Sequence, residues 1–266
     1  MAASDAAPFA VQLLAETERL SATRLAAPDI AAHLPLDFED KYATPCWTSK
    51  DDGKLRCLPA FFLAGGPGSG KSFVTSSAFA GTGLKLVNSD LAFERNLKKA
   101  GLSMKMPDEE EYFRNIIRQS AKKFVITQLD QYIRGRLGLI IDSTGRDYDM
   151  IARQHNQLKQ LGYDCYMVFV NTSLEVALQR NARRERTIPE YITTSSWNGV
   201  QSNMGKFQRL FGMSNFLVVD NNKSDLELTT LTMNRVSKEV RKLIKAPISS
   251  YIAKRWMASE RKAKRR

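Results

Sequence analysis

The sequence predicts an α/β fold: a doubly wound, mostly parallel sheet of five strands with helices on both faces. The first observation is a set of apolar runs that are continuous rather than alternating, which is typical of strands buried on both faces. The second is that longer amphipathic segments separate these runs, as expected for parallel strands joined by crossover helices. The third is a glycine-rich segment directly after the first apolar run, where a strand would turn into a helix.

The expected elements follow from this alternation. The apolar runs predict strands at 60–64, 84–88, 137–142, 163–170 and 216–219. The amphipathic segments predict helices at 71–80, 90–100, 108–134, 148–161, 174–184, 190–210 and 225–244. Prolines break the chain before residue 59 and again at Pro247. We therefore expect an N-terminal helical and loop appendage at 1–58, one main domain at 59–246 and a basic tail at 247–266.

The glycine-rich segment matches the phosphate-binding loop G-x-x-x-x-G-K-[ST] at every fixed position. It consists of Gly65, Gly66, Pro67, Gly68, Ser69, Gly70, Lys71 and Ser72. Between a strand and a helix, such a loop points backbone N–H groups and a helix N-terminus at an anion. Lys71 would bring a positive charge to the terminal phosphates, and the hydroxyl of Ser72 suits Mg²⁺. The motif predicts a site for ATP and Mg²⁺; the alternative is a chance glycine-rich turn.

Two carboxylates follow strands whose carboxyl ends should meet this loop. Asp142 closes the apolar run 139–141, a position suited to holding Mg²⁺ directly or through water. Asp90 follows the second strand about twenty residues after Lys71, where a general base for a hydroxyl acceptor is needed. For both residues the alternative is a helix N-cap, and an aspartate can serve both purposes.

Arginines are crowded into the segment 179–186. Arg180, Arg183 and Arg184 are spaced to share one helix face, which suits a lid over a triphosphate. Arg180 would then bind the nucleotide, and Arg184 would stabilise charge in the transition state. The alternative is a solvated basic helix without a catalytic role. Arg146, in the turn after Asp142, is a further candidate for holding the acceptor.

Composition narrows the partners and the compartment. The formal net charge is +12 and the isoelectric point is about 9.7, which favours a polyanion such as nucleic acid as partner. The basic residues of 254–266 would form an electrostatic arm, or else a frayed, solvated terminus. The few scattered cysteines (Cys46, Cys57 and Cys165) fit a reducing cytoplasm. We see no secretory signal and no membrane span, and we infer no protein partner.

The chain resembles the P-loop kinases that include phage polynucleotide kinase and the zeta-toxin family. The likeness covers about residues 59–220 and rests on the loop 65–72, the segments 87–90, 139–144 and 162–164, and 179–184 followed by Pro189. It implies an ATP-dependent phosphotransferase with an alcohol acceptor, in the host cytoplasm if the protein is phage-encoded. It also implies that Asp90 is the base, Lys71 the phosphate lysine, Ser72 the Mg²⁺ ligand and Arg184 the lid arginine.

One departure bears on the acceptor. In the polynucleotide kinase pattern an arginine follows the base by three residues and reads the acceptor's phosphate, whereas this chain has Phe93 there. An aromatic ring at this point would stack on a nucleobase, as required for phosphorylating a hydroxymethyl group on a modified base in DNA. The alternative is that Phe93 packs in the core with Leu91 and Leu97.

Three functions remain open from the sequence. The first is a kinase for a hydroxyl on nucleic acid, DNA more than RNA, at a modified base or at a 5′ end. The second is a small-molecule kinase of the zeta-toxin kind that acts on a sugar nucleotide or a nucleoside. The third, an ATP-hydrolysing motor or switch, would need a glutamate beside Asp142 to activate water, and Ser143 stands there instead.

Overall fold

The computed structural model describes residues 58–222 and 226–263, and the predicted appendage at 1–58 lies almost entirely outside these ranges. Its centre is a sheet of five strands, all parallel, in the order β2-β3-β1-β4-β5. Its members are β1 (Pro59–Ala64), β2 (Lys85–Val87), β3 (Leu139–Asp142), β4 (Asp164–Asn171) and β5 (Phe216–Asp220). The predicted fold class is thus confirmed.

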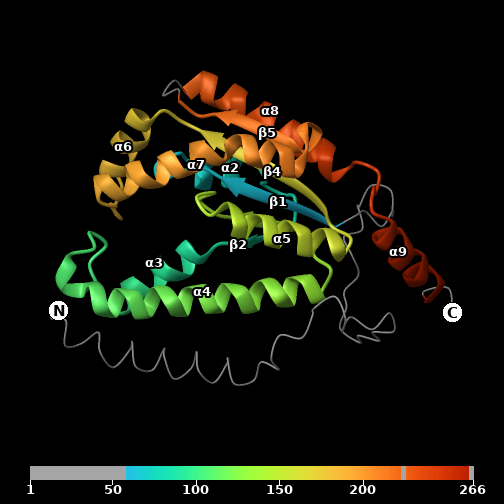
Figure 1. Ribbon diagram of the computed structural model, residues 1–266, viewed down its shortest axis with the longest axis horizontal. Coiled ribbons are helices and arrows are strands. Elements are labelled where there is room, and N and C mark those ends of the chain that lie inside the picture. Colours follow the sequence, from blue (N-terminus) through green and yellow to red (C-terminus); the bar gives the residue numbers. More distant parts are fainter. Residues whose placement is uncertain (1–57, 223–225, 264–266) are drawn as a thin grey trace.

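Helices cover both faces of this sheet (Figure 1). One face carries α3 (Ser89–Lys99), α4 (Glu111–Arg134), α5 (Tyr148–Gln160) and α7 (Glu190–Phe211). The other carries α2 (Lys71–Ala78) and α8 (Leu226–Ile244). Strand β1 shows why the apolar run is continuous, because Phe62 contributes to the core on one side while Phe61 and Leu63 contribute to the core on the other.

The elements differ from the expected ones mainly at their ends. Strand β2 is three residues long instead of five; it lies at the edge of the sheet and pairs with β3 alone. The helix expected from 108 begins with a short 3₁₀ turn, η2 (Asp108–Glu110), and a second 3₁₀ turn, η3 (Met213–Asn215), precedes β5. The helix α6 (Leu174–Ala182) ends two residues before the predicted boundary, with Arg183 as its C-cap.

The predicted basic tail contains a helix that is docked on the domain, α9 (Tyr251–Ala263). Ala253 and Met257 are buried, at 1% and 6% exposure, and the guanidinium of Arg136 lies 5.3 Å from the ring of Trp256. Ser249, just before the helix, donates a hydrogen bond to Asp164 at the start of β4. The helix therefore packs at the amino ends of the strands, away from the end where β1 enters the glycine-rich loop (Figure 1). Residues 264–266 lie outside the described part of the chain.

Within the described ranges, none of the helices combines the length and the apolar character that crossing a membrane requires.

Candidate active site

The glycine-rich loop connects β1 to α2 and is fixed at both ends. The backbone N–H of Gly65 donates to the carbonyl oxygen of Thr144 (2.9 Å), and the Asn221 side chain donates to the carbonyl oxygen of Ser69 (2.7 Å). Asn221 follows β5, so three strands of the sheet hold the loop in place. The ammonium of Lys71 turns back over the loop and donates to the carbonyl oxygen of Gly65 at 2.6 Å.

Two of the loop glycines are required by space as well as by backbone angle. Gly68 has φ +79°, and a Cβ there would lie 2.1 Å from the carbonyl oxygen of Ala177 in α6. Gly70, with φ +89°, is the N-cap of α2, and a Cβ there would lie 2.3 Å from the Asn221 amide nitrogen. The loop thus packs closely against α6 and Asn221. These contacts hold its backbone in the conformation that directs N–H groups at an anion.

Lys71, Asp142 and Asp90 form one electrostatic cluster. Burial lowers the pKa of Lys71, and the charges of Asp142 and Asp90 oppose that shift. Burial likewise raises the pKa of Asp142, and the charge of Lys71 opposes it. The charge of Asp90 acts on both groups, so its carboxylate lies within electrostatic range of Lys71 and Asp142. The structure brings these predicted residues together from α2, β3 and α3.

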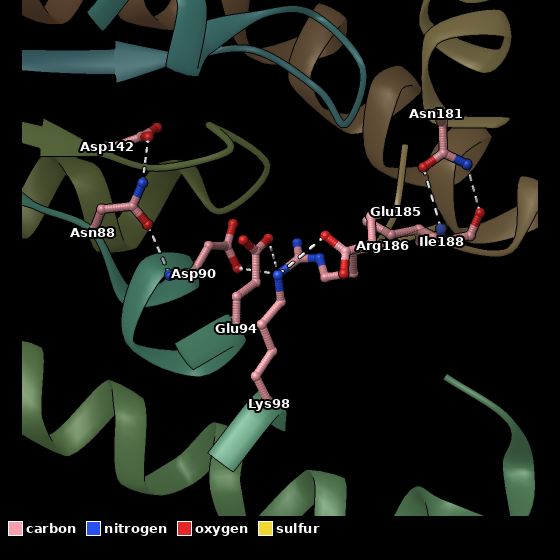
Figure 2. A network of polar contacts seen from close by, with 9 residues as sticks. All are labelled: Asn88, Asp90, Glu94, Lys98, Asp142, Asn181, Glu185, Arg186 and Ile188. Carbon is pink, nitrogen blue, oxygen red and sulfur yellow. Dashed lines mark hydrogen bonds and ion pairs between the residues drawn. The ribbon is translucent and has the colours of Figure 1, made fainter. Parts of the chain in front are cut away.

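Asn88 connects the two aspartates (Figure 2). Its side-chain nitrogen donates to Oδ2 of Asp142 at 2.7 Å, and its side-chain oxygen accepts the backbone N–H of Asp90 at 2.7 Å. Asn88 is the N-cap of α3, so the same side chain begins the helix that carries Asp90 and fixes the rotamer of Asp142.

The residues present fit a magnesium ion that arrives with a nucleotide. Oδ1 of Asp142 is buried without a hydrogen-bond partner among the described residues, although Oδ2 is satisfied by Asn88. The exposed Ser72 supplies a hydroxyl at the start of α2. Across the described ranges no three His, Cys, Asp or Glu side chains form a metal cage, so phosphate oxygens and water would complete the coordination.

The predicted arginine face does not form on a single helix. Arg180 lies on α6 and donates to the carbonyl oxygen of Asn221 (2.8 Å), next to the phosphate loop. Arg184 lies beyond the end of the helix in an exposed loop, yet its charge reaches Lys71 and Asp142. The helix stops because the buried Asn181 side chain exchanges two hydrogen bonds with the backbone of Ile188, which folds residues 183–188 into a closed loop.

Arg186, on this loop, is the arginine that meets the predicted base (Figure 2). Its Nη1 lies 3.3 Å from Oδ1 of Asp90 and 3.2 Å from Oε1 of Glu94, and its side chain is 11% exposed. A second ion pair joins Glu185 to Lys98 at 3.1 Å. Three ion pairs therefore hold the loop 183–188 against α3 beside Asp90.

Two predicted acceptor residues are placed differently from each other. Arg146 is exposed in the turn before α5 and lines an open hollow in the surface together with Tyr148 and Lys206. Phe93 is 2% exposed in the core, and the guanidinium carbons of Arg118 and Arg186 lie 4.4 Å and 5.7 Å from its ring centre. A nucleobase could not stack on this ring here, so the predicted contact with Phe93 is corrected to core packing.

Three residues at or near the site received no individual role from the sequence: Arg118, Arg186 and Asn221. Asn221 directly follows β5, so extending the strand-end rule to the last strand would have found it. Arg186 was visible in the arginine-rich segment, but nothing local distinguishes it from its neighbours. Arg118 lies within α4, and only the packing of α4 against α3 brings it to Phe93.

Comparisons with known proteins agree with the fold. The model of the family described as AAA domain matches residues 61–207. A candidate kinase from Chloroflexus aurantiacus is 15% identical with a TM-score of 0.50, over 70% of this chain and 98% of that one. At this identity, the likeness shows the fold.

Two further solved structures are more distant. The PezAT toxin–antitoxin system of Streptococcus pneumoniae is 14% identical with a TM-score of 0.47, over 76% of this chain and 91% of that one. Shikimate kinase from Acinetobacter baumannii, solved with shikimate, is 20% identical with a TM-score of 0.45, over 70% of this chain and 93% of that one. No curated protein matches the chain.

Proposed function

The chain belongs to the family described as AAA domain, and on that premise we propose that it is an ATP-dependent phosphotransferase with an alcohol as acceptor. The observation that carries the proposal is the cluster of Lys71, Asp142 and Asp90 at the carboxyl ends of the strands. A phosphate loop alone would serve binding or hydrolysis equally well. Transfer to a hydroxyl also requires a second carboxylate, and Asp90, on the helix after β2, lies within electrostatic range of the loop lysine.

Each residue has a task in this reaction. The acceptor oxygen bonds to the γ-phosphorus of ATP, the bond to the β,γ-bridging oxygen breaks, and ADP leaves. Asp90 orients the hydroxyl and takes its proton, and Oδ2 of Asp90 is free for this among the described residues. Lys71, released from the carbonyl oxygen of Gly65, places its charge against the phosphate oxygens.

The remaining residues hold and shield this arrangement. Bound Mg²⁺ would supply charge neutralisation between the phosphates, and Asp142 and Ser72 are the residues that would hold it. Asn88 fixes the rotamer of Asp142 through its hydrogen bond to Oδ2. Arg184 would stabilise the charge that develops on the transferred group, and Arg180 would hold the nucleotide beside Gly70.

For the acceptor, we propose a hydroxyl on nucleic acid, either a hydroxymethyl group on a modified base in DNA or a 5′ end. The formal net charge of +12 supports this choice, because it concentrates polyanions at the surface. The exposed Arg146 and Lys206, together with Tyr148 in the same open surface hollow, are suited to a nucleic-acid strand.

A small-molecule acceptor of the sugar-nucleotide or nucleoside kind is comparably supported. Arg184 and Arg186 lie on one short loop beside the acidic cluster, which suits a small doubly charged substrate as well as a strand. The exposed basic residues of α9, in contrast, lie at the other end of the sheet (Figure 1). They would contribute to nucleic-acid binding only for a substrate long enough to span the domain.

The experiment is incubation with γ-labelled ATP, Mg²⁺ and a panel of acceptors. The panel contains 5′-hydroxyl oligonucleotides, duplex DNA with hydroxymethyl pyrimidines, free nucleosides and sugar nucleotides. Label on either nucleic acid supports the first acceptor class, and label on a sugar nucleotide or nucleoside supports the second. Release of inorganic phosphate alone, with every acceptor unlabelled, would contradict the proposed transfer.

A further inference from the structure

Three arginines lie around Phe93, and two carboxylates lie near them. Arg118 and Arg186 both lie over the Phe93 ring, and Arg114 stands one turn before Arg118 on α4. The carboxylates near them are Asp90 and Glu94, and both are paired with Arg186. Arg114 donates to the carbonyl oxygen of Pro107, which is neutral.

Arg118 is the guanidinium left without a polar partner. Among the described residues it makes no hydrogen bond and no ion pair, and its contact is with the Phe93 ring. Burial lowers the pKa of Arg118, the charges of Arg186 and Arg114 add to that shift, and the charge of Asp90 opposes it. A half-buried guanidinium that faces like charge is costly to hold in place, and an anion between the arginines would remove that cost.

Arg186 also has donors to spare. Both of its ion pairs use Nη1, and within the described residues Nη2 and Nε have no hydrogen-bond partner. A guanidinium presents its N–H groups as a planar fork that matches two oxygens of one phosphate. The fork is 11% exposed, so a ligand there would be bound in a nearly desolvated place, where charged hydrogen bonds are strong.

We infer that Arg118 and Arg186 form a binding site for a phosphate group that belongs to the acceptor, beside the carboxylate of Asp90. This inference rests on the proposed function, because it takes Asp90 as the group that meets the acceptor hydroxyl. Arg186 contacts Asp90 and lies over Phe93, one helical turn along α3, so an acceptor bound here carries its phosphate close to its reacting hydroxyl. The diphosphate of a sugar nucleotide and the backbone of a polynucleotide both offer such a group.

The Phe93 ring has a specific place in this arrangement. It stands three residues after the proposed base on the same helix. Two guanidinium groups contact this ring, one from α4 and one from the loop after α6. The aromatic residue thus serves the acceptor indirectly, by positioning guanidinium groups.

The test compares two acceptors that differ in one charge. One is a 5′-hydroxyl dinucleotide with its natural phosphodiester, and the other has a neutral methylphosphonate linkage of the same size. With the wild-type protein we expect a lower KM for the phosphodiester. Arg118→Gln should raise that KM about 10- to 100-fold and leave the KM for the methylphosphonate unchanged, since a charged hydrogen bond is lost with the first acceptor alone.

Two variants control this experiment. Lys123→Gln removes the same charge from an exposed position of α4 and should leave both KM values unchanged. Arg118→Lys keeps the charge without the fork and should restore part of the preference. An equal rise in both KM values for Arg118→Gln, or a wild-type protein indifferent to the linkage, would overturn the inference. A sugar nucleotide run in parallel identifies the source of the phosphate, as the acceptor whose KM rises most in Arg118→Gln.

Failure of the proposed function would look different. If the wild-type protein labels no acceptor, the transfer proposal fails, and calorimetric binding of the two dinucleotides decides the inference by itself. Tighter wild-type binding of the phosphodiester, abolished by Arg118→Gln, would still support the phosphate site. Equal binding of the two dinucleotides, or binding of neither, would overturn it.

Discussion

The two ends of the central sheet are built for opposite purposes. At the carboxyl end, Oδ1 of Asp142 and the Ser69 hydroxyl are buried without partners among the described residues, and the side chain of Asp90 is 55% exposed. At the amino end, Asp164 is buried and accepts a hydrogen bond from Ser249, and the Tyr163 hydroxyl donates to the carbonyl oxygen of Leu137. Unsatisfied buried groups cost stability, so they persist where a ligand completes them.

This contrast predicts that substitutions at the two ends separate activity from stability. The largest effect on activity at the phosphate loop should come from Lys71→Ala. We expect transfer to fall by about 100- to 1,000-fold, because a charge aimed at the phosphates is lost. The free energy of unfolding should be unchanged or higher, since burial already disfavours the charged lysine. Rate assays and urea denaturation measure the two effects, with the exposed Lys99→Ala as control. A wild-type rate in Lys71→Ala would contradict the contrast.

At the amino end we expect the reverse from Met257→Ala. Met257 is 6% exposed in α9, and truncating it should lower the free energy of unfolding by about 2–4 kcal/mol. The transfer rate of the folded protein should not change, because α9 lies away from the phosphate loop. Lys254→Ala, on the exposed side of the same helix, is the matched control. A tenfold loss of rate at full folding would break the comparison.

The docking of α9 also changes how the basic C-terminus must be tested. Deleting 254–266 would remove the buried Met257 together with the charges, so a loss of nucleic-acid binding would be ambiguous. Replacing Lys254, Arg255 and Lys262 by glutamine keeps the packing, since their side chains are exposed. If α9 binds nucleic acid, the salt dependence of binding should become less steep, by about one unit for each phosphate that the variant no longer neutralises.

Asn88 affects both stability and activity, because it caps α3 and also holds the Asp142 carboxylate. Asn88→Ala removes the N-cap of α3 and should cost about 1 kcal/mol of stability. It also frees the Asp142 carboxylate, and if Asp142 holds Mg²⁺ as proposed, the rate should fall about tenfold. Asn88→Ser can cap the helix but cannot donate the same amide hydrogen bond, so it should restore stability and not rate. If Asn88→Ser restored the rate as well as the stability, the role of Asn88 would be limited to capping α3.

The smallest expected effect is a pH dependence of stability caused by the buried His155 on α5. Burial lowers the pKa of His155, so the folded protein binds a proton at this residue less readily than the unfolded chain, whose histidine has the ordinary pKa of 6.5. The free energy of unfolding should therefore fall as the pH drops below 6.5, by at most about 1.4 kcal/mol per pH unit. His155→Gln should remove this slope in denaturation curves at pH 5 to 7. An unchanged slope would assign it to other groups.

The sequence predicted those features that depend on local pattern, namely the strands, the helices and the residues at the strand ends. Continuous apolar runs predicted the parallel sheet, and the strand-end rule placed Asp90 and Asp142 beside Lys71. It could not predict Arg186 meeting Asp90, because the pair is 96 residues apart and forms only when Asn181 closes the loop. Phe93 was ambiguous for a similar reason, since an aromatic residue near a site is either a platform or a contact until its neighbours are known.

The amino end shows the opposite limitation. The charges of 254–266 dominate that part of the sequence, and they indicated either an electrostatic arm or a frayed, solvated terminus. The spacing of Ala253 and Met257, four residues apart, already marked one apolar helix face. The sequence could not show which surface this helix face packs against. That surface includes Gly162 and Asp164, and it exists only once the sheet has formed.

The central claim is that Asp90 receives the proton of an incoming hydroxyl opposite the phosphate loop. The most direct measurement is single-turnover transfer from γ-labelled ATP in Asp90→Asn, with ATP affinity measured on the same preparation. We expect the transfer rate to fall by about 100- to 10,000-fold while ATP binds nearly as in the wild type. Transfer at the wild-type rate, or a loss of ATP affinity without a loss of rate, would contradict the account.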